Sequence, residues 1–255
     1  MKKTKLILAI LLGLWQTMQA QVTDAIKGAA KASGSVAKSY SSGGGDAAAS
    51  GCANGCADIG CQILFTELFV NMWSYHESLY RGNVERINSI EVEATAYSNL
   101  VEPYYGFRPR VRGNWGLFST DFRVAMLYDQ APDGSFGGFH TKDWQILGLN
   151  LIALDEFNLR VGSGFMYQDF DQKSYWENTA MADVYLNDWQ IGAEGRIASQ
   201  TSGAAPRKEL SLKISRKIAE RGHFSTHFIA QGVYNRYFNA VDTWLFGGGI
   251  GIKFQ

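Results

Sequence analysis

Residues 89–96 read Ser-Ile-Glu-Val-Glu-Ala-Thr-Ala, and residues 107–112 read Phe-Arg-Pro-Arg-Val-Arg. In both stretches a mostly apolar residue alternates with a polar one, which is the pattern of a β-strand with one apolar and one polar face. The polar face of the first stretch holds Glu91 and Glu93, and that of the second holds three arginines. The two stretches predict neighbouring strands whose opposite charges lie on the same side.

The same period of two continues to the C-terminus and gives ten segments of about ten residues each over 87–255. The links between the segments alternate in length. Short links are predicted at 113–114, 155–156, 187–188 and 220–222, and longer ones at 99–104, 130–140, 169–174, 200–208 and 236–242. This alternation is typical of an outer-membrane barrel, which has short periplasmic turns and longer outer loops. The predicted fold class is all-β: an antiparallel transmembrane β-barrel of about ten strands with a flexible N-terminal segment and a short amphipathic helix.

Composition narrows the class of protein further. The chain has 255 residues, of which 46% are hydrophobic and 13% aromatic, and its 24 basic residues balance 24 acidic ones. A disordered chain has fewer aromatic residues, and a nucleic-acid-binding protein usually has a basic excess, so neither class is expected. Three cysteines are too few for a disulfide-dense scaffold.

Residues 1–20 have the features of a secretory signal peptide. Lys2, Lys3 and Lys5 precede an apolar run that ends at Trp15, and Ala20 provides a small residue for cleavage. The run is shorter than the ~20 residues that a transmembrane helix needs. Removing this segment takes away three positive charges and leaves an exported, slightly acidic chain.

Two segments separate the signal peptide from the barrel. Residues 21–50 are rich in Ala, Gly, Ser and Lys, and we predict that they are flexible because they bury little apolar surface. Residues 51–86 begin with Cys52, Cys56 and Cys61. In an oxidising compartment two of these cysteines are expected to form a disulfide, with the pairing left open, whereas three thiolates without a nearby histidine are a poor metal site. From Ile63 to Tyr80 apolar residues recur every three or four positions, which predicts an amphipathic helix that docks on the protein or lies on a membrane surface.

The last segment carries a resemblance to a known class. It reads Trp244-Leu-Phe-Gly-Gly-Gly-Ile-Gly-Ile-Lys-Phe254-Gln255 and resembles the C-terminal strand of Gram-negative outer-membrane β-barrel proteins, although Phe254 is penultimate and not last. The resemblance covers 87–255 at the level of pattern. It implies location in the outer membrane of the cell envelope, contact with outer-membrane lipid, and an assembly signal that the barrel-assembly machinery reads. That signal would consist of Trp244, Phe246, Ile250, Ile252 and Phe254.

Aromatic residues lie near the ends of the segments, where two girdles at the membrane interfaces would place them. Trp115, Phe118, Phe157 and Trp189 lie near the short links, and Tyr104, Tyr128, Tyr167, Tyr175, Trp176 and Tyr237 lie near the long ones.

If the apolar faces contact lipid, the polar faces line the interior. The predicted interior charge network consists of Glu91, Glu93, Arg108, Arg110, Arg112, Asp121, Arg123, Arg160, Asp183, Glu194, Arg196, Lys213, Lys217 and Lys253. A barrel of about ten strands is narrow, so we expect these side chains to fill it with ion pairs. A small polar pore, which the row of arginines would make anion-preferring, is the alternative.

We expect no enzymatic activity, no catalytic residue, no metal and no cofactor. His140 and Asp143 near a long loop, and the triplet His223-Phe224-Ser225, superficially resemble parts of outer-membrane hydrolase sites. A hydrolase needs a nucleophile, a base and an orienting group that converge, and the sequence does not supply all three. Motifs for nucleotide or zinc binding are also missing.

The sequence therefore predicts an outer-membrane barrel with a structural or envelope-associated docking role, and with a possible periplasmic partner for residues 21–86. Three alternatives remain open: a narrow polar channel, a soluble secreted barrel that binds a lipophilic ligand inside, and a surface hydrolase.

Overall fold

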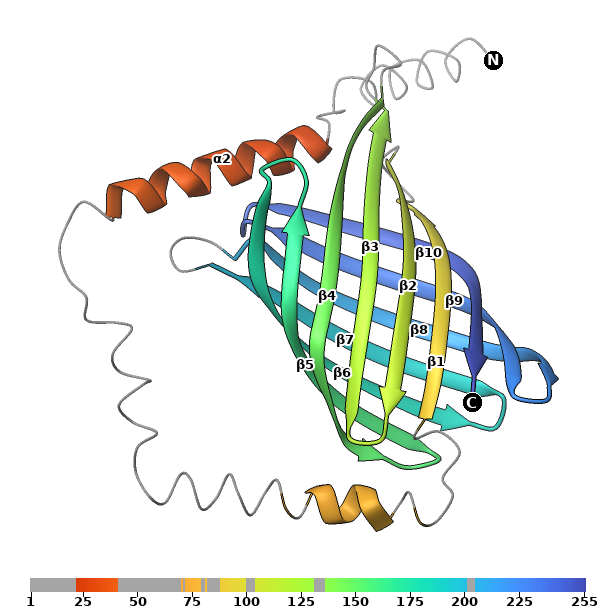
Figure 1. Ribbon diagram of the computed structural model, residues 1–255. Coiled ribbons are helices and arrows are strands. Elements are labelled where there is room, and N and C mark those ends of the chain that lie inside the picture. The colour runs from red at the N-terminus through yellow and green to blue at the C-terminus, as the bar shows by residue number, and fades with distance from the viewer. Residues whose placement is uncertain are drawn as a thin grey trace, which may run out of the picture.

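A computed structural model describes residues 22–40, 70, 72–78, 81, 88–99, 104–130, 136–200 and 205–255. Ten antiparallel strands form one closed barrel, in which each strand pairs with its chain neighbours and β1 closes on β10 (Figure 1). The strands are β1 (Asn88–Ser98), β2 (Tyr104–Trp115), β3 (Phe118–Gln130), β4 (Phe136–Ala153), β5 (Phe157–Gln168), β6 (Lys173–Leu186), β7 (Trp189–Ser199), β8 (Arg207–Arg221), β9 (Phe224–Tyr237) and β10 (Val241–Phe254). The prediction of an all-β, ten-stranded antiparallel barrel is confirmed.

The links between consecutive strands are short at one end of the barrel and longer at the other, and we call these the short-turn end and the long-loop end. At the short-turn end the links are 116–117, 154–156, 187–188 and 222–223, and β1 begins there. Gly116, Asn187 and Gly222 take positive φ at the first position of three of these turns, a conformation that glycine and asparagine adopt most easily. At the long-loop end the links are 99–103, 131–135, 169–172, 200–206 and 238–240.

Several predicted boundaries were wrong. Gly113 and Asn114 continue β2, and the turn follows two residues later at Gly116. Strands β3, β4, β8 and β9 extend further toward the long-loop end than predicted, because their alternation of faces continues into residues that look like polar loop. In β4 the alternation is broken by two register shifts, so Ile146 and Leu147 are both exposed although they are adjacent.

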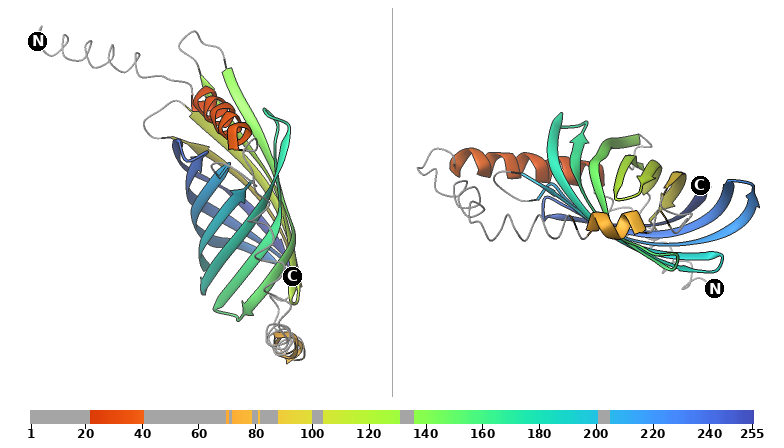
Figure 2. Two further views of the ribbon diagram at one scale, coloured as in Figure 1. Left: turned by 90° about the vertical axis from the view of Figure 1, so that its left-hand side faces the viewer. Right: turned by 60° about the horizontal axis from the view of Figure 1, so that its bottom comes forward.

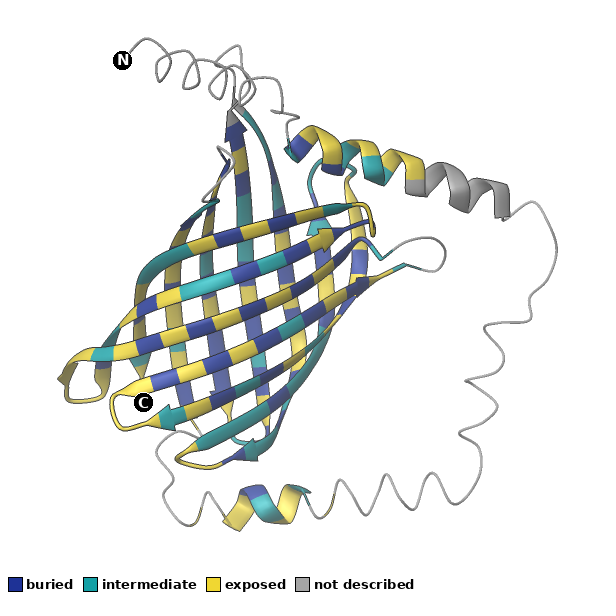
Figure 3. Cartoon of the chain, turned by 180° about the vertical axis from the view of Figure 1, so that it is seen from behind, coloured by how far each residue is buried: buried dark blue, intermediate teal, exposed yellow. Residues whose placement is uncertain are grey.

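On the other strands, successive side chains alternate regularly between the outer and the inner face of the barrel. Figure 3 shows this as alternating bands of exposed and buried residues. Exposed large apolar side chains lie on every strand of the barrel. The proposed assembly signal on β10 belongs to this surface, because Trp244, Phe246, Ile250, Ile252 and Phe254 all point outward. The barrel is therefore apolar outside and largely polar within.

At the seam between β1 and β10, the inner face of β10 is almost bare. Gly247, Gly249 and Gly251 occupy three successive inward positions of β10. A Cβ atom on Gly247 would lie 2.0 Å from the carbonyl oxygen of Ala96, and one on Gly249 would lie 2.0 Å from that of Ala94. Glycine is required at both positions because the β1 backbone comes too close for any side chain.

Among the described residues, two helical segments precede β1, and Figure 2 shows them at opposite ends of the barrel. Helix α2 (Val22–Tyr40) meets the long-loop end, where it contacts β3, β4 and β10. Residues 22–40, which belong to the segment predicted to be flexible, form this helix, and residues 41–50 lie outside the described residues. Within this Ala- and Lys-rich helix, Val22, Ile26, Ala29 and Ala30 recur at helical spacing and form the face that packs on the barrel.

Residues 72–78 are helical as predicted, but most of the rest of the segment from Ile63 to Tyr80 lies outside the described residues. This short helix lies at the short-turn end, where His76 Nε2 donates a hydrogen bond of 2.5 Å to the carbonyl oxygen of Asn150. The signal peptide at 1–20 and the three cysteines Cys52, Cys56 and Cys61 lie outside the described residues. Among the helices that the structure describes, none is both long and apolar enough to cross a membrane.

Candidate functional site

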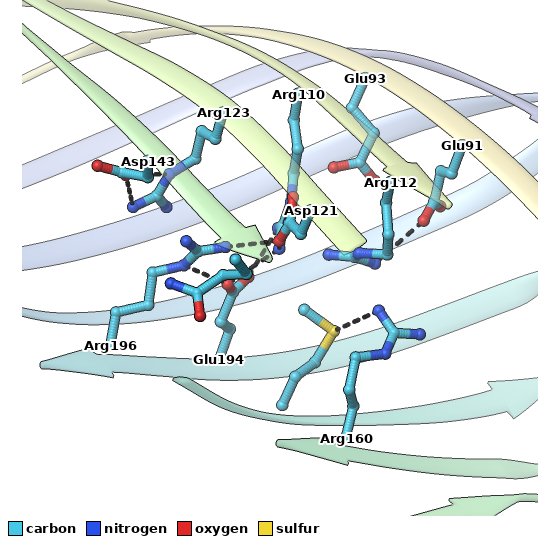
Figure 4. A network of polar contacts seen from close by, with 12 residues as sticks. Glu91, Glu93, Arg110, Arg112, Asp121, Arg123, Asp143, Arg160, Glu194 and Arg196 are labelled. Carbon is cyan, nitrogen blue, oxygen red and sulfur yellow. Dashed lines mark hydrogen bonds and ion pairs between the residues drawn. The ribbon is translucent and has the colours of Figure 1, made fainter. Parts of the chain in front are cut away.

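The charged side chains of the barrel point inward and are mostly buried. Among the described residues, eight buried Arg or Lys side chains face eight buried Asp or Glu side chains. Alternation along each strand puts them there, because every second residue points inward. Figure 4 shows the central part of this network, with contributions from strands far apart in the sequence.

Arg123 on β3 lies at the centre of the first of two clusters. It donates to Asp143 on β4 with an Nε–Oδ2 distance of 2.8 Å, and to Glu209 on β8 with an Nη1–Oε1 distance of 2.6 Å. Glu209 also accepts from Arg108, and Asp143 accepts from Arg207 at 2.7 Å. Each carboxylate is therefore shared by two guanidinium groups, so no single pair is independent of the others.

Arg110 on β2 organises the second cluster. Its guanidinium is bidentate to Glu194, with Nη–Oε distances of 2.7 and 2.9 Å, and it also binds Asp121. Arg196 binds the same two carboxylates and lies 3.6 Å from Glu177, which connects the clusters because Glu177 also accepts from Arg207. Such charge-assisted, bidentate contacts are the strongest hydrogen bonds available to a buried arginine.

Toward the short-turn end the network becomes simpler. Lys213 Nζ lies 2.6 Å from Glu93, and Arg112 Nη1 lies 3.0 Å from Glu91. Arg160 donates to the side-chain oxygen of Asn150 at 2.7 Å, and Asn150 donates in turn to the carbonyl oxygen of Gly116 in the short turn.

The structure describes every residue that was predicted for the interior charge network. Eleven are buried: Glu93, Arg108, Arg110, Arg112, Asp121, Arg123, Arg160, Asp183, Glu194, Arg196 and Lys213. Glu91 and Lys253 are half-buried near the short-turn end, where Lys253 lies over the ring of Tyr185. Lys217, 34% exposed, pairs with Asp188 and Glu220 at the turns and does not join the buried clusters.

Sequence reasoning missed four members of the network: Asp143, Glu177, Arg207 and Glu209. Arg207 and Glu209 were assigned to or beside a loop, although they continue the alternation that includes Ser211 and Lys213. The signal was therefore present, and the error was to end the strand where the polar residues became dense.

The long-loop end of the interior has a different character. Tyr97, Leu127, Phe139, Val233 and Leu245 form an apolar cluster together with Tyr104, Tyr237 and Phe238, and Ile26 of α2 is fully buried against it. We call this set the apolar mouth. The prediction that Tyr104, Tyr175 and Tyr237 belong to a membrane girdle was wrong, because all three side chains are buried, whereas Trp115, Tyr128, Trp176 and Trp189 do point outward.

A polar contact fixes the start of α2 in the apolar mouth. Thr23 donates its backbone N–H to Asp129 Oδ2 at 2.9 Å and its hydroxyl to Oδ1 at 2.8 Å. Both residues are buried. A carboxylate that accepts from the first turn of a helix satisfies backbone N–H groups that have no partner within the helix.

Two small cavities lie among the interior side chains that the structure describes. A cavity beside Arg110, Asp183 and Lys213 has a volume of about 10 Å³, and one beside Phe139 and Leu245 has about 20 Å³. Either volume suffices for about one water molecule. A larger hollow of about 70 Å³ opens at the short-turn end and is lined by Ser225, His227 and Lys253 among others.

The residues considered for a hydrolase do not converge. His140 is 42% exposed and lies 3.3 Å from Asp169, whereas Asp143 is buried in the ion-pair network. His223 lies beside the ring of Phe254 at the short turn, and Ser225 lies 2.9 Å from Nε2 of a different histidine, His227. In the part of the chain that the structure describes, no group of three metal-ligating side chains is present.

Comparisons with known proteins do not show a family for this chain. No protein-family model matches the chain, and no curated protein is found to be related to it.

Proposed function

We propose that the chain is exported and inserted into the outer membrane of a Gram-negative cell, where it serves a structural or docking role as a barrel with a filled interior. The observation that carries the proposal is the distribution of side chains: the apolar ones surround a closed barrel on the outside, and the charges are paired inside it. Soluble monomers rarely expose an apolar patch larger than a few hundred Å².

The size of the apolar belt supports a lipid environment. Leu212, Ile214 and Ile218 on one strand are each about half exposed, and every other strand adds similar residues. Transfer of apolar surface out of water is worth roughly 25 cal/mol per Å². Tens of such side chains therefore favour lipid by far more than the few kcal/mol that any single contact within the barrel contributes.

The same distribution argues against a soluble barrel with a lipophilic ligand inside. Such a barrel needs an apolar interior, whereas the centre of this one contains guanidinium and carboxylate groups. Its only large apolar region inside, the apolar mouth, is filled by Ile26 among the described residues.

Membrane extraction tests the proposal directly. We expect the protein, expressed with its own first 20 residues in a Gram-negative host, to remain in the outer-membrane pellet after washes with carbonate and with urea. The folded barrel should also migrate differently from the boiled protein in SDS gels. Release of folded protein into the carbonate supernatant would contradict a membrane-spanning barrel.

A docking role is proposed for the segment before the barrel. On the helix at 72–78, Trp73 is about half exposed, as is the neighbouring Val70. Exposed aromatic and aliphatic residues next to a docked helix are a common anchor for a protein partner. In-cell photo-cross-linking from position 73 should capture a periplasmic protein, and Glu77, on the same exposed surface, provides a comparison position.

A narrow channel is the second candidate, and the arginines on β2 favour it. Arg108, Arg110 and Arg112 lie in one inward row that anions would meet. Against a channel, each of them is buried and bound to a carboxylate, and the cavities nearby hold about one water molecule. We expect no steady conductance steps from purified protein in planar bilayers, and regular anion-selective steps would favour the channel.

We propose no enzymatic activity and no cofactor. The residues that resemble hydrolase motifs lie on different faces of the barrel and leave no nucleophile, base and orienting group in one place.

A further inference from the structure

The interior charge network holds more positive than negative charge. Among the described residues, eight buried arginine and lysine side chains face eight buried carboxylates, but one of these carboxylates, Asp129, binds the start of α2 and no arginine. The half-buried Glu91 and Lys253 add one charge of each sign. One positive charge inside the barrel is therefore left without a carboxylate of its own.

The excess charge lies around Arg160 on β5. In the part of the chain that the structure describes, its guanidinium forms no ion pair. Nε donates to the side-chain oxygen of Asn150 at 2.7 Å, and Nη1 lies 4.0 Å from the sulfur of Met181. Each of the other buried cations is paired with at least one carboxylate. A buried charge with only neutral partners is costly, so this position calls for an anion.

The neighbouring Arg112 has spare hydrogen-bond donors. Its Nη1 binds Glu91, but Nε and Nη2 are buried without a partner among the described residues, and only 2% of the residue is exposed. Arg110 repels Arg112 more strongly than any single carboxylate attracts it, and Arg112 in turn repels Arg160. Figure 4 shows the side chains of Arg112 and Arg160 extending toward one another from different strands.

A cavity of about 10 Å³ adjoins these donors. Arg112 and Lys213 line it, and so does Met181, whose sulfur contacts Arg160. The volume suits one particle of about the size of a water molecule. A chloride ion is only slightly larger, and the flexible, polarizable thioether of Met181 can adjust to it. Tetrahedral oxyanions such as sulfate are too large.

The two carboxylates on the cavity wall do not fill this role. Glu194 already accepts from Arg110 and Arg196, and Asp183 accepts from the side chain of Gln190 at 2.9 Å. Asp183 attracts Arg160 from beyond ion-pair distance, and more weakly than Arg112 repels it. The wall of the cavity therefore favours a small anion.

We propose that the cavity binds one chloride ion, with Nε and Nη2 of Arg112 as hydrogen-bond donors and Arg160 as the second cation. The ion supplies the negative charge that the network lacks because Asp129 binds α2, and it gives two buried N–H groups a charge-assisted partner. The site is formed by inward side chains, so binding is expected in lipid and in detergent alike.

Urea unfolding at constant ionic strength tests the proposal. The full chain, refolded in a zwitterionic detergent, is unfolded in sodium chloride and in mixtures in which gluconate, too large for the cavity, replaces chloride. A ligand that binds only the folded state lowers the unfolding equilibrium constant in proportion to its concentration once its site is nearly saturated.

We expect the unfolding constant to fall about tenfold for each tenfold rise in chloride in that range, as one ion per barrel requires. Bromide should replace chloride, and sulfate should not. An unfolding constant that does not depend on chloride would overturn the proposal and would assign the cavity to water.

Two arginine variants locate the effect. Arg160→Met removes the cation that has no ion pair, and it should make the unfolding constant independent of chloride. Arg216→Met is the matched control, because Arg216 is exposed on the outer surface over the ring of Trp189, and it should keep the full dependence. Equal dependence on chloride in the two variants would mean that the ion binds elsewhere, which contradicts the site.

A second measurement needs no variant and covers the case in which Arg160→Met does not fold. Crystals of the parent protein grown in sodium bromide should show one anomalous peak in the cavity beside Arg112. Bromide peaks confined to the outer surface of the barrel would overturn the proposal.

Discussion

The two halves of the barrel interior are built from different chemistry. The middle of the interior is filled by ion pairs, such as Arg110 with Glu194, whereas the apolar mouth at the long-loop end is filled by Phe139, Leu245 and the inserted Ile26. The outer surface is apolar around both halves. The outer face is therefore uniform, whereas the inner face follows a separate requirement, which is that every buried charge must find a partner.

This difference has a consequence for how each half tolerates change. The charged half depends on shared partners, so that removal of one group leaves several others unpaired. The apolar mouth depends on packing and loses stability in proportion to the surface that is removed. The variants below distinguish the ion-pair network from the apolar mouth and are ordered from the largest expected loss of stability to the smallest effect.

Glu209→Ala should cause the largest loss. It leaves Arg108 and Arg123 without a shared carboxylate in the barrel interior, and breaking a buried ion pair costs about 3–5 kcal/mol. Urea unfolding of the refolded barrel, followed by the gel shift, measures the loss. Lys208→Ala on the adjacent outward position is the control and should change stability by less than about 1 kcal/mol. Equal loss in both variants would show that the network is not a stabilising unit.

Lys213→Met should cost about 3 kcal/mol, because Glu93 then remains buried beside Glu91 without its nearest cation. The double variant Lys213→Met/Glu93→Met should recover most of that loss, since an apolar pair can replace a buried ion pair at little cost. Double-mutant analysis of urea midpoints checks this. A double variant no more stable than the single one would mean that Lys213 contributes through packing and not through its charge.

Ile26→Ala should weaken the docking of α2 by about 2 kcal/mol and leave the barrel itself unchanged. Hydrogen exchange of residues 22–40 in the detergent-solubilised protein should increase, while that of β3 and β4 should not. Lys31→Ala, on the exposed side of the helix, should change neither. Loss of protection in the strands would contradict the independence of the two halves.

The smallest expected effect concerns His76. Burial lowers the pKa of this imidazole, and this effect outweighs the hydrogen bond from Nε2 to the Asn150 carbonyl, which raises the pKa. A histidine with a lowered pKa binds fewer protons when docked, so docking is weakened as the pH falls through the ordinary histidine pKa of about 6.5.

Hydrogen exchange of residues 72–78, corrected for its intrinsic pH dependence, should therefore rise between pH 7.5 and pH 5.5. His76→Gln keeps a donor near the same position but does not titrate, and it should remove the trend. A trend of equal size in that variant would assign the effect to another group.

Much of the fold could be read from alternation alone, because a period of two is a local property of each strand. Arg207 and Glu209 could have been found in the same way had the strand been continued. The bulges in β4 could not, since they depend on how β4 pairs with β3 and β5. Nor could the docking of α2, because the contact of Thr23 with Asp129 joins residues 106 positions apart.

The bare inner face of β10 bears on the kinetics of folding. Nine of the ten strand pairings join neighbours in the chain and can form as local hairpins, whereas the pairing of β1 with β10 must bring together the two ends of the barrel sequence. Because Gly247 and Gly249 present no side chains inward, β10 can approach β1 without displacing packed groups. Closure of this seam joins the two ends of the sheet and leaves the barrel without a free strand edge.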